Sequence, residues 1–265
     1  MTARRLVLLV LVAAVPVVCL SAVAGCRTAG PCGLILTSGS WWPVALGPPV
    51  LVASMAVAAW TVRLAVTASL ASRELARLHY VQAPPKLARS AAAAGVVRIA
   101  CIATSSPMAF CAGLMRPTLF VSQGAVALLS EQELLAVLHH EADHARRREP
   151  LRRMARKAAA DALAFLPIVR WWSERQVERS EFAADLAAER SAGRAALAGA
   201  LLVMTEPASS LAAFGGHAEM RATRLLGLQV EEARPPRALW ASSFVYTWLA
   251  LSLAGCVFEV IVALT

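Results

Sequence analysis

Residues 130–150 read SEQELLAVLHHEADHARRREP, and they predict a helix that carries a chemical motif. Ser130 and Glu133 form a capping box, the pattern in which two side chains satisfy the first free amide groups of a helix. The apolar run that follows predicts a helix from about Glu131 to about Arg148, and Glu149-Pro150 marks its end.

The motif on this helix is His140-Glu141-Ala142-Asp143-His144, an HExxH pattern. Residues four apart lie on one face of a helix, so both imidazoles can reach a single Zn²⁺. Catalytic zinc takes three protein ligands and a water. We expect Glu141 to be the general base that accepts a proton from this water and passes it to the leaving amine. The motif therefore predicts zinc-dependent hydrolysis.

A third protein ligand is expected on a later helix. Glu181 begins the run EFAAD, 37 residues after His144, where an antiparallel helix can return over the motif. Asp185 follows one turn later on the same face, so we expect it to orient a ligating histidine through the free ring N–H. The predicted metal ligands are His140, His144 and Glu181, and Asp185 is predicted to hydrogen-bond to one of the two histidines.

The rest of the chain is too apolar for an ordinary soluble domain. Of its 265 residues, 58% are hydrophobic and 16% are charged, with a mean hydropathy of +0.59. Soluble domains carry about a quarter charged residues. No charged side chain lies between Arg27 and Arg63. This composition excludes disordered, collagen-like and disulfide-scaffold classes, and it indicates an integral membrane protein with one polar domain.

Three apolar stretches are long enough to cross a bilayer, for which about 20 helical residues suffice. They are Leu6–Gly25, a window inside Trp42–Val62, and Ala238–Phe258. Because basic residues lie before the first stretch and after the second, we expect the N-terminus inside and the C-terminus outside. The predicted parts are two spans in residues 1–70, a cytosolic domain in residues 71–237 and a third span in residues 238–265.

The cytosolic domain is predicted to be α+β. Three β-favouring runs separated by proline-containing turns predict a small antiparallel sheet; they are Val96–Thr104, Met108–Leu114 and Thr118–Gln123. Further helices are expected over Leu151–Phe165, Arg170–Ser191 and Arg194–Met204. The expected fold class is a mainly helical integral membrane protein with about three transmembrane helices and a zincin-like metallopeptidase domain.

The basic residues point to a lipid surface rather than to nucleic acid. The net charge is +9, and 24 of the 26 basic residues are arginines, most of them on the expected cytosolic helices. Attraction to anionic headgroups, about 1 kcal/mol per basic residue near the surface, explains them better than DNA, because no recognition helix is evident. The expected partners are the lipid bilayer and a cytosolic protein substrate. Cys26 and Cys32 share the outer loop, where a disulfide is permitted.

A set of motifs within about Val96–Ala188 points to a known family. The segments are Phe110–Pro117, His140–His144, Arg147–Leu151, and Phe165–Pro167 with Trp171-Trp172. They resemble the β-lactam sensor-transducer family of integral-membrane zinc metallopeptidases, which carry a similar G-L-x-R-P strand, HExxH helix and aromatic-Pro element. The resemblance implies a gluzincin site, with His140, His144 and Glu181 as ligands and Glu141 as the catalytic base.

The resembled family also implies a biological role and a place in the cell. Its peptidases respond to a signal across the bacterial plasma membrane, and this leads to cleavage of a cytosolic transcriptional repressor, sometimes after self-cleavage. For this chain the resemblance implies regulatory proteolysis at that membrane. We expect the chain to lack the penicillin-binding sensor domain and to have three spans in place of four, which leaves the stimulus and the substrate open.

Two other functions remain open. A membrane quality-control or CAAX-type metalloprotease has much the same HExxH and ExxxD patterns, although its larger number of spans and the G-L-x-R-P run here argue against it. A non-catalytic membrane sensor or scaffold that keeps the fold is the alternative from another class. Glu141 argues against a scaffold, because a purely structural zinc site needs no base.

Overall fold

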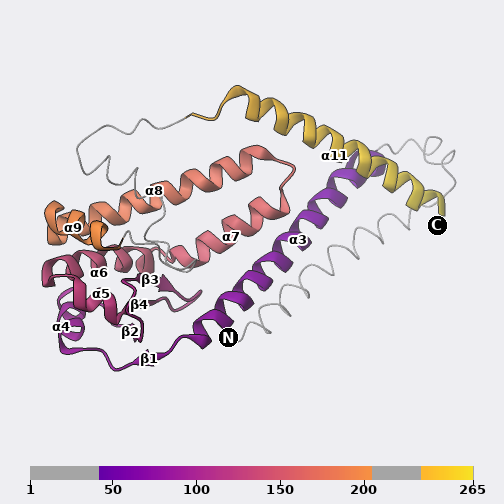
Figure 1. Cartoon of the computed structure of the whole chain (residues 1–265). Helices are drawn as coiled ribbons and strands as arrows, with labels where there is room; N and C mark the ends of the chain where they lie inside the picture. Colours follow the sequence, from indigo (N-terminus) through magenta and orange to yellow (C-terminus); the bar gives the residue numbers. More distant parts are fainter. Residues whose placement is uncertain (1–41, 205–233, 265) are drawn as a thin grey trace. The chain divides into compact units, whose positions relative to one another are not determined.

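The computed structural model describes residues 42–204 and 234–264, and it shows a mainly helical chain with one small sheet (Figure 1). The predicted span Leu6–Gly25 and the pair Cys26 and Cys32 lie outside the described residues. The elements are α3 (Trp42–Arg77), β1 (Tyr80–Val81), α4 (Pro85–Ala93), β2 (Ile99–Ile102), β3 (Ala109–Ala112), β4 (Thr118–Ser122), α5 (Gln123–Leu128), α6 (Glu131–Arg146), α7 (Glu149–Ala162), α8 (Pro167–Ala192), α9 (Arg194–Met204) and α11 (Arg237–Leu264).

The described residues form two compact units. The first contains residues 42–69, 155–173 and 234–264, and the second contains residues 70–154 and 174–204. Helices α3, α7 and α8 each contribute residues to both units. The candidate site lies wholly in the second unit.

The sheet of the second unit has the strand order β1-β2-β4-β3. Antiparallel pairs join β1 to β2 and β3 to β4, but β2 and β4 are parallel, with Ile99 opposite Leu119 and Ile102 opposite Ser122. The prediction of an antiparallel sheet is therefore wrong, and the sheet is mixed. Four of the five residues of β4 are buried, which suits the central position between the two strands that precede it in the sequence.

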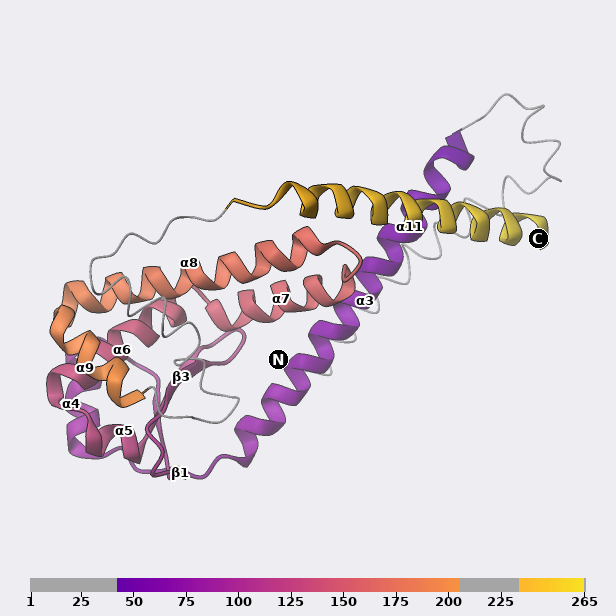
Figure 2. The same cartoon turned by 45° about the horizontal axis from the view of Figure 1, so that its top comes forward.

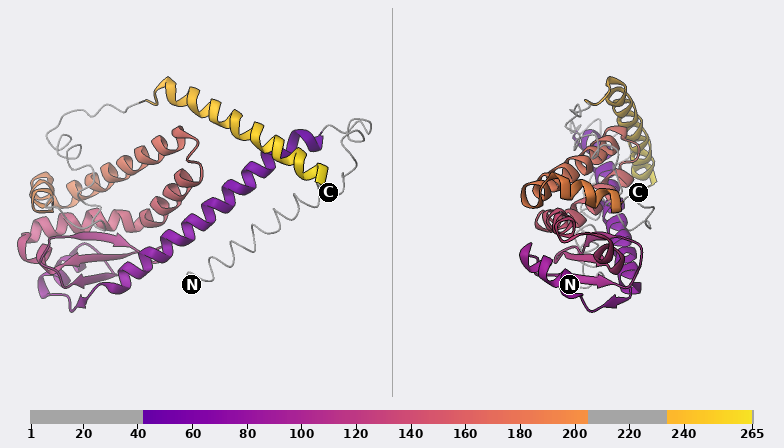
Figure 3. Two further views of the ribbon diagram at one scale, coloured as in Figure 1. Left: turned by 45° about the vertical axis from the view of Figure 1, so that its right-hand side comes forward. Right: turned by 60° about the vertical axis from the view of Figure 1, so that its left-hand side comes forward.

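Helix α6 lies between the sheet and α9, and α4 also packs against it (Figure 3). Leu134 and Leu138 of α6 are fully buried in one core with Val121 of β4 and Leu197 of α9. Burial of one such leucine stabilises the fold by about 1.5–3 kcal/mol. Because packing holds α6 on opposite sides, the motif that it carries has a fixed position.

Both ends of α6 have a local cause. Ser130 Oγ accepts a hydrogen bond from the Glu133 amide at 3.3 Å, and Glu133 Oε2 accepts one from the Ser130 amide at 2.7 Å, which confirms the predicted capping box. The other end differs from the prediction, because α6 stops at Arg146 and Arg148 adopts a φ of 53°. Glu149-Pro150 therefore starts α7, where the missing amide of a first-turn proline costs nothing.

The turn between β3 and β4 contains the run Gly113-Leu114-Met115-Arg116-Pro117. Gly113 has a φ of 110°, and a Cβ added there would lie 2.8 Å from the Arg116 carbonyl oxygen. Only glycine accepts both the backbone conformation and this close approach. The run is thus the sequence of a tight connection between the two strands.

Two helices of the described chain, α3 with most of its length in the first unit and α11 wholly in it, are long and apolar enough to cross a membrane. They are α3 over Gly47–Arg77 and α11 over Arg237–Gly255, in the regions of the second and third predicted spans. Their apolar side chains are largely exposed, for example Met55 at 66% and Phe244 at 73%. Exposed apolar surface on this scale marks contact with a membrane or a partner. The same unit contains the ends of α7 and α8 and the loop that joins them (Figure 2).

Candidate metal centre

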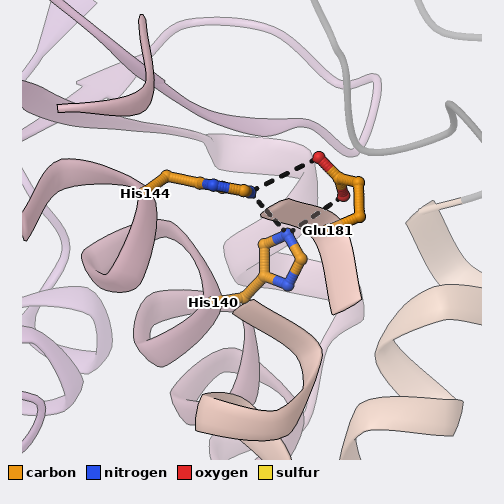
Figure 4. Close-up of side chains that lie close together, drawn as sticks. All are labelled: His140, His144 and Glu181. Carbon is orange, nitrogen blue, oxygen red and sulfur yellow. Dashed lines mark hydrogen bonds and ion pairs between the residues drawn. The ribbon is translucent and has the colours of Figure 1, made fainter. Parts of the chain in front are cut away.

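Three buried side chains converge at one point in the second unit (Figure 4). His140 and His144 come from α6, and Glu181 comes from α8. The two histidine Nε2 atoms lie 3.1 Å apart, and each lies 3.5 Å from a carboxylate oxygen of Glu181. The exposed fraction of each residue is 6% or less. Such a cluster is costly to bury unless it is paired or holds an ion.

The donor set fits zinc. A tetrahedral zinc ion with bonds of about 2.0–2.1 Å keeps its ligand atoms about 3.3 Å apart. The three separations here, 3.1, 3.5 and 3.5 Å, agree with that value. Two imidazoles and one carboxylate are also a known ligand set of catalytic zinc, which keeps a fourth position for water. His140, His144 and Glu181 therefore form a buried zinc-site triad, as the sequence predicted.

Asp185 lies one turn beyond Glu181 on α8. Its Oδ1 atom is 3.0 Å from His140 Nδ1 on the side of the ring away from Glu181. An Nδ1–H that donates to this carboxylate leaves the Nε2 lone pair directed into the triad. Asp185 is itself buried, at 6% exposure. The carboxylate therefore sits where it can fix the orientation of one ligand.

Sequence reasoning missed Arg153 of α7. Its Nη2 atom donates to Glu181 Oε1, and its Nε atom lies 3.6 Å from Glu149 Oε1. Glu149 is 2% exposed, and Arg153 thus connects two buried carboxylates. One arginine among 24 is not conspicuous in the sequence. The spacing of four residues between Glu149 and Arg153, however, could have indicated an ion pair on one helix.

The charges around Glu181 set its protonation. Burial alone raises the pKa of a carboxyl group, yet in the metal-free site the hydrogen bond to His140 and the positive charges of protonated His140, Arg153 and protonated His144 outweigh it. Together they hold the pKa of Glu181 well below its usual range. The carboxylate is therefore ionised at neutral pH, as a metal ligand must be.

The triad opens onto a pocket of about 230 Å³. Glu141 lines it beside the two histidines and is 4% exposed. The facing wall is β3 with Gly113, and Leu75 of α3 and Met154 of α7 add apolar surface. A charged centre thus lies at the bottom of a mainly apolar recess.

Cys111 of β3 also lines this pocket. Burial, and then the negative charge of Glu141, raise the pKa of its thiol to about 12, against the effect of Arg153. Only a thiolate is a good nucleophile, and a raised pKa keeps this thiol protonated at neutral pH. The hydrolytic chemistry of the pocket therefore does not come from the cysteine.

The fold and the site define a metallopeptidase in which an HExxH helix and a glutamate from a later helix hold zinc. The sequence profile of peptidase family M48 matches residues 52–225, a range that includes both histidines and Glu181. No curated protein and no solved structure shows significant similarity to the chain. The chain belongs to peptidase family M48, and it is a zinc metallopeptidase.

Proposed function

We propose that the protein is a membrane-anchored zinc endopeptidase that cleaves a protein substrate at the cytosolic face of a bacterial plasma membrane. The observation that carries the proposal is one pocket in which Glu141, the zinc-site triad and β3 meet. These parts supply a base, a metal site and a surface for an extended peptide. The proposal extends the family assignment to mechanism, substrate form and location.

Each side chain of the site has a proposed role. His140, His144 and Glu181 would hold zinc, which would supply Lewis-acid chemistry and lower the pKa of a water in the site from about 15.7 towards about 7. Glu141 accepts the proton of the attacking water and delivers it to the leaving amine. Asp185 keeps His140 in the tautomer and orientation that ligation requires.

The substrate backbone is proposed to bind along β3. In the described sheet β3 is an edge strand, since it pairs with β4 on one side only. An extended peptide that adds to such an edge gains main-chain hydrogen bonds with little dependence on side chains. Residues 109–113 line the same pocket as Glu141, so a peptide on this edge passes the metal site. This arrangement suits cleavage within a chain rather than at its ends.

The location follows from the apolar helices and the charges. Helices α3 and α11 have the length and composition of membrane spans. Arginines follow the second predicted span at Arg63, Arg73 and Arg77, which favours a cytosolic position for the residues after it. A protein in the cytosol or in the membrane surface is then the accessible class of substrate.

Regulatory proteolysis is the proposed role, through cleavage of a transcriptional repressor or through self-cleavage. The support is the G-L-x-R-P turn beside the HExxH helix, the combination that resembles the β-lactam sensor-transducers. Membrane protein quality control is the second candidate, favoured by the sequence-tolerant binding that an edge strand offers. A repressor encoded beside the gene and cut by the protein favours regulation, whereas cleavage of unfolded membrane proteins favours quality control.

The test uses the full chain in detergent with zinc, and peptides blocked at both termini. We expect internal cleavage by the unaltered protein. Glu141→Gln should abolish turnover and leave zinc content unchanged, whereas Glu181→Gln should reduce zinc binding. Glu131→Gln, at the exposed start of the same helix, is the matched control and should change neither. Cleavage that survives Glu141→Gln would overturn the mechanism.

A further inference from the structure

The loop between α7 and α8 belongs to the first compact unit, together with the apolar part of α3 and with α11. Residues 162–169, the hairpin tip, read ALAFLPIV and have no charged side chain between Asp161 and Arg170. We propose that the hairpin tip is a re-entrant element that enters the hydrocarbon core of the membrane from the cytosolic side and contacts lipid there. The inference rests on the proposed membrane location of α3 and α11.

The hairpin tip borders an apolar cavity of about 400 Å³. Ala162 and Phe165 line it together with five residues of α3 between Leu51 and Ala59 and four of α11 between Ala250 and Val257. Both helix segments lie in stretches without a charged residue, 28–62 and 238–258. At 1.5 Å per residue, the α3 wall lies about 6–18 Å along the helix from Arg63. The tip therefore lies beside the interior of two apolar spans.

Two hydrogen bonds tie the hairpin to these helices. Trp60 Nε1 of α3 donates to the Ala155 carbonyl at 3.0 Å, and the Ile168 amide donates to Ser243 Oγ of α11 at 3.2 Å. Ser243 is 6% exposed, on a helix that is mostly apolar. Ile168 lies in the first turn of α8, where an amide has no partner within its helix. An unpaired amide costs several kcal/mol in hydrocarbon, so this hydrogen bond provides a partner that lipid could not supply.

The hairpin tip is short enough, and has suitable flanking residues, to enter the membrane and return to the same cytosolic side. The tip has eight residues, four of them in the turn between α7 and α8, whereas a helical crossing needs about 20 residues. Trp171 and Trp172 follow the tip, and tryptophan is enriched at the membrane interface. Before the tip, Lys157 Nζ lies 3.9 Å from Asp161, and Lys157 is long enough to reach the headgroups.

The test measures the surroundings of single nitroxide labels in a chain without its six native cysteines. The protein, checked for zinc content, is reconstituted in vesicles of phosphatidylethanolamine and phosphatidylglycerol. Labels are placed by Ala164→Cys at the exposed tip, Leu249→Cys on the exposed face of α11 and Ser191→Cys on the exposed end of α8. Collision rates with oxygen and with a water-soluble nickel chelate then distinguish lipid, water and protein interior.

We expect the Ala164→Cys label to collide often with oxygen and about tenfold less with the chelate than the Ser191→Cys label. A chelate collision rate equal to that at Ser191→Cys would overturn the proposal, and so would low rates with both agents, which indicate burial in protein. The Leu249→Cys label distinguishes failure of the proposed membrane location of α11 from failure of the re-entrant hairpin alone. If it is in water, the membrane location itself fails; if it is in lipid while Ala164→Cys is in water, only the re-entrant hairpin fails.

Discussion

His140 Nδ1 lies 3.0 Å from Asp185 Oδ1, which places a buried carboxylate where it can accept a hydrogen bond from that ring nitrogen. We expect Asp185→Ala to weaken zinc binding about 10–100-fold, because the imidazole loses both orientation and basicity. Competition with a chromogenic chelator measures this. Glu189→Ala, one turn further on α8 in a pair with Arg194, is the control. Equal zinc affinity in both variants would show that Asp185 does not orient the ligand.

Arg153 compensates the charge of Glu181 and Glu149. Arg153→Met should destabilise the zinc-free protein by about 2–3 kcal/mol, less than for a fully buried pair because the arginine side chain is 26% exposed. Zinc should reduce this loss, because the ion neutralises Glu181. Unfolding in detergent, with and without zinc, checks both points. Arg89→Met is the control, because it removes an exposed ion pair with Glu131 and should change the free energy of unfolding little. If Arg153→Met lowers stability equally with and without zinc, Arg153 does not act by compensating the charge of Glu181.

The capping box of α6 should give part of the stability a pH dependence. Backbone and side-chain hydrogen bonds with Ser130 lower the pKa of Glu133 below its ordinary value of 4.5. A lowered pKa in the folded state means that the contribution is complete above about pH 4.5 and disappears as the pH falls through the folded value. Glu133→Gln keeps the cap without a titrating group. The stability difference between the two proteins should therefore shrink below about pH 4.5, and a constant difference would refute the role of the charge.

Gly124 marks a close approach between α5 and the loop after β2. A Cβ at this position would lie 1.9 Å from the Ser105 carbonyl oxygen, which is a backbone atom. Gly124→Ala should destabilise the protein by about 3 kcal/mol, since the loop must move. Gly193→Ala is the control, because its positive φ strains the backbone but no atom lies near the added carbon. A smaller midpoint shift for Gly124→Ala than for Gly193→Ala would contradict the clash.

Much of α6 and of the metal site could be predicted because the signals are local. A capping box, an apolar period and an i, i+4 histidine pair all act within one helix. The third ligand, Glu181, needed only a helix that returns, and α8 does return over α6. The start of α6 and the identity of the triad were therefore accessible from residue types and spacing.

Strand pairing could not be predicted in the same way. The three β-favouring runs were found, but β4 inserts between β2 and β3, and the resulting parallel pair depends on contacts that the local pattern does not encode. The two-residue strand β1 and the helices α4 and α5 are too short for a clear period and were missed. Arg153 was missed for a related reason, because its partner Glu181 lies on another helix.

The zinc ligands come from two helices, and Glu181 lies 37 positions after His144. An ion held by both helices closes this length of chain into a loop and binds only the folded state. By mass action, free zinc at one hundred times the dissociation constant adds about 2.7 kcal/mol to the free energy of unfolding. The lifetime of the folded domain, and with it the amount of enzyme that survives cellular degradation, is thereby coupled to the supply of zinc.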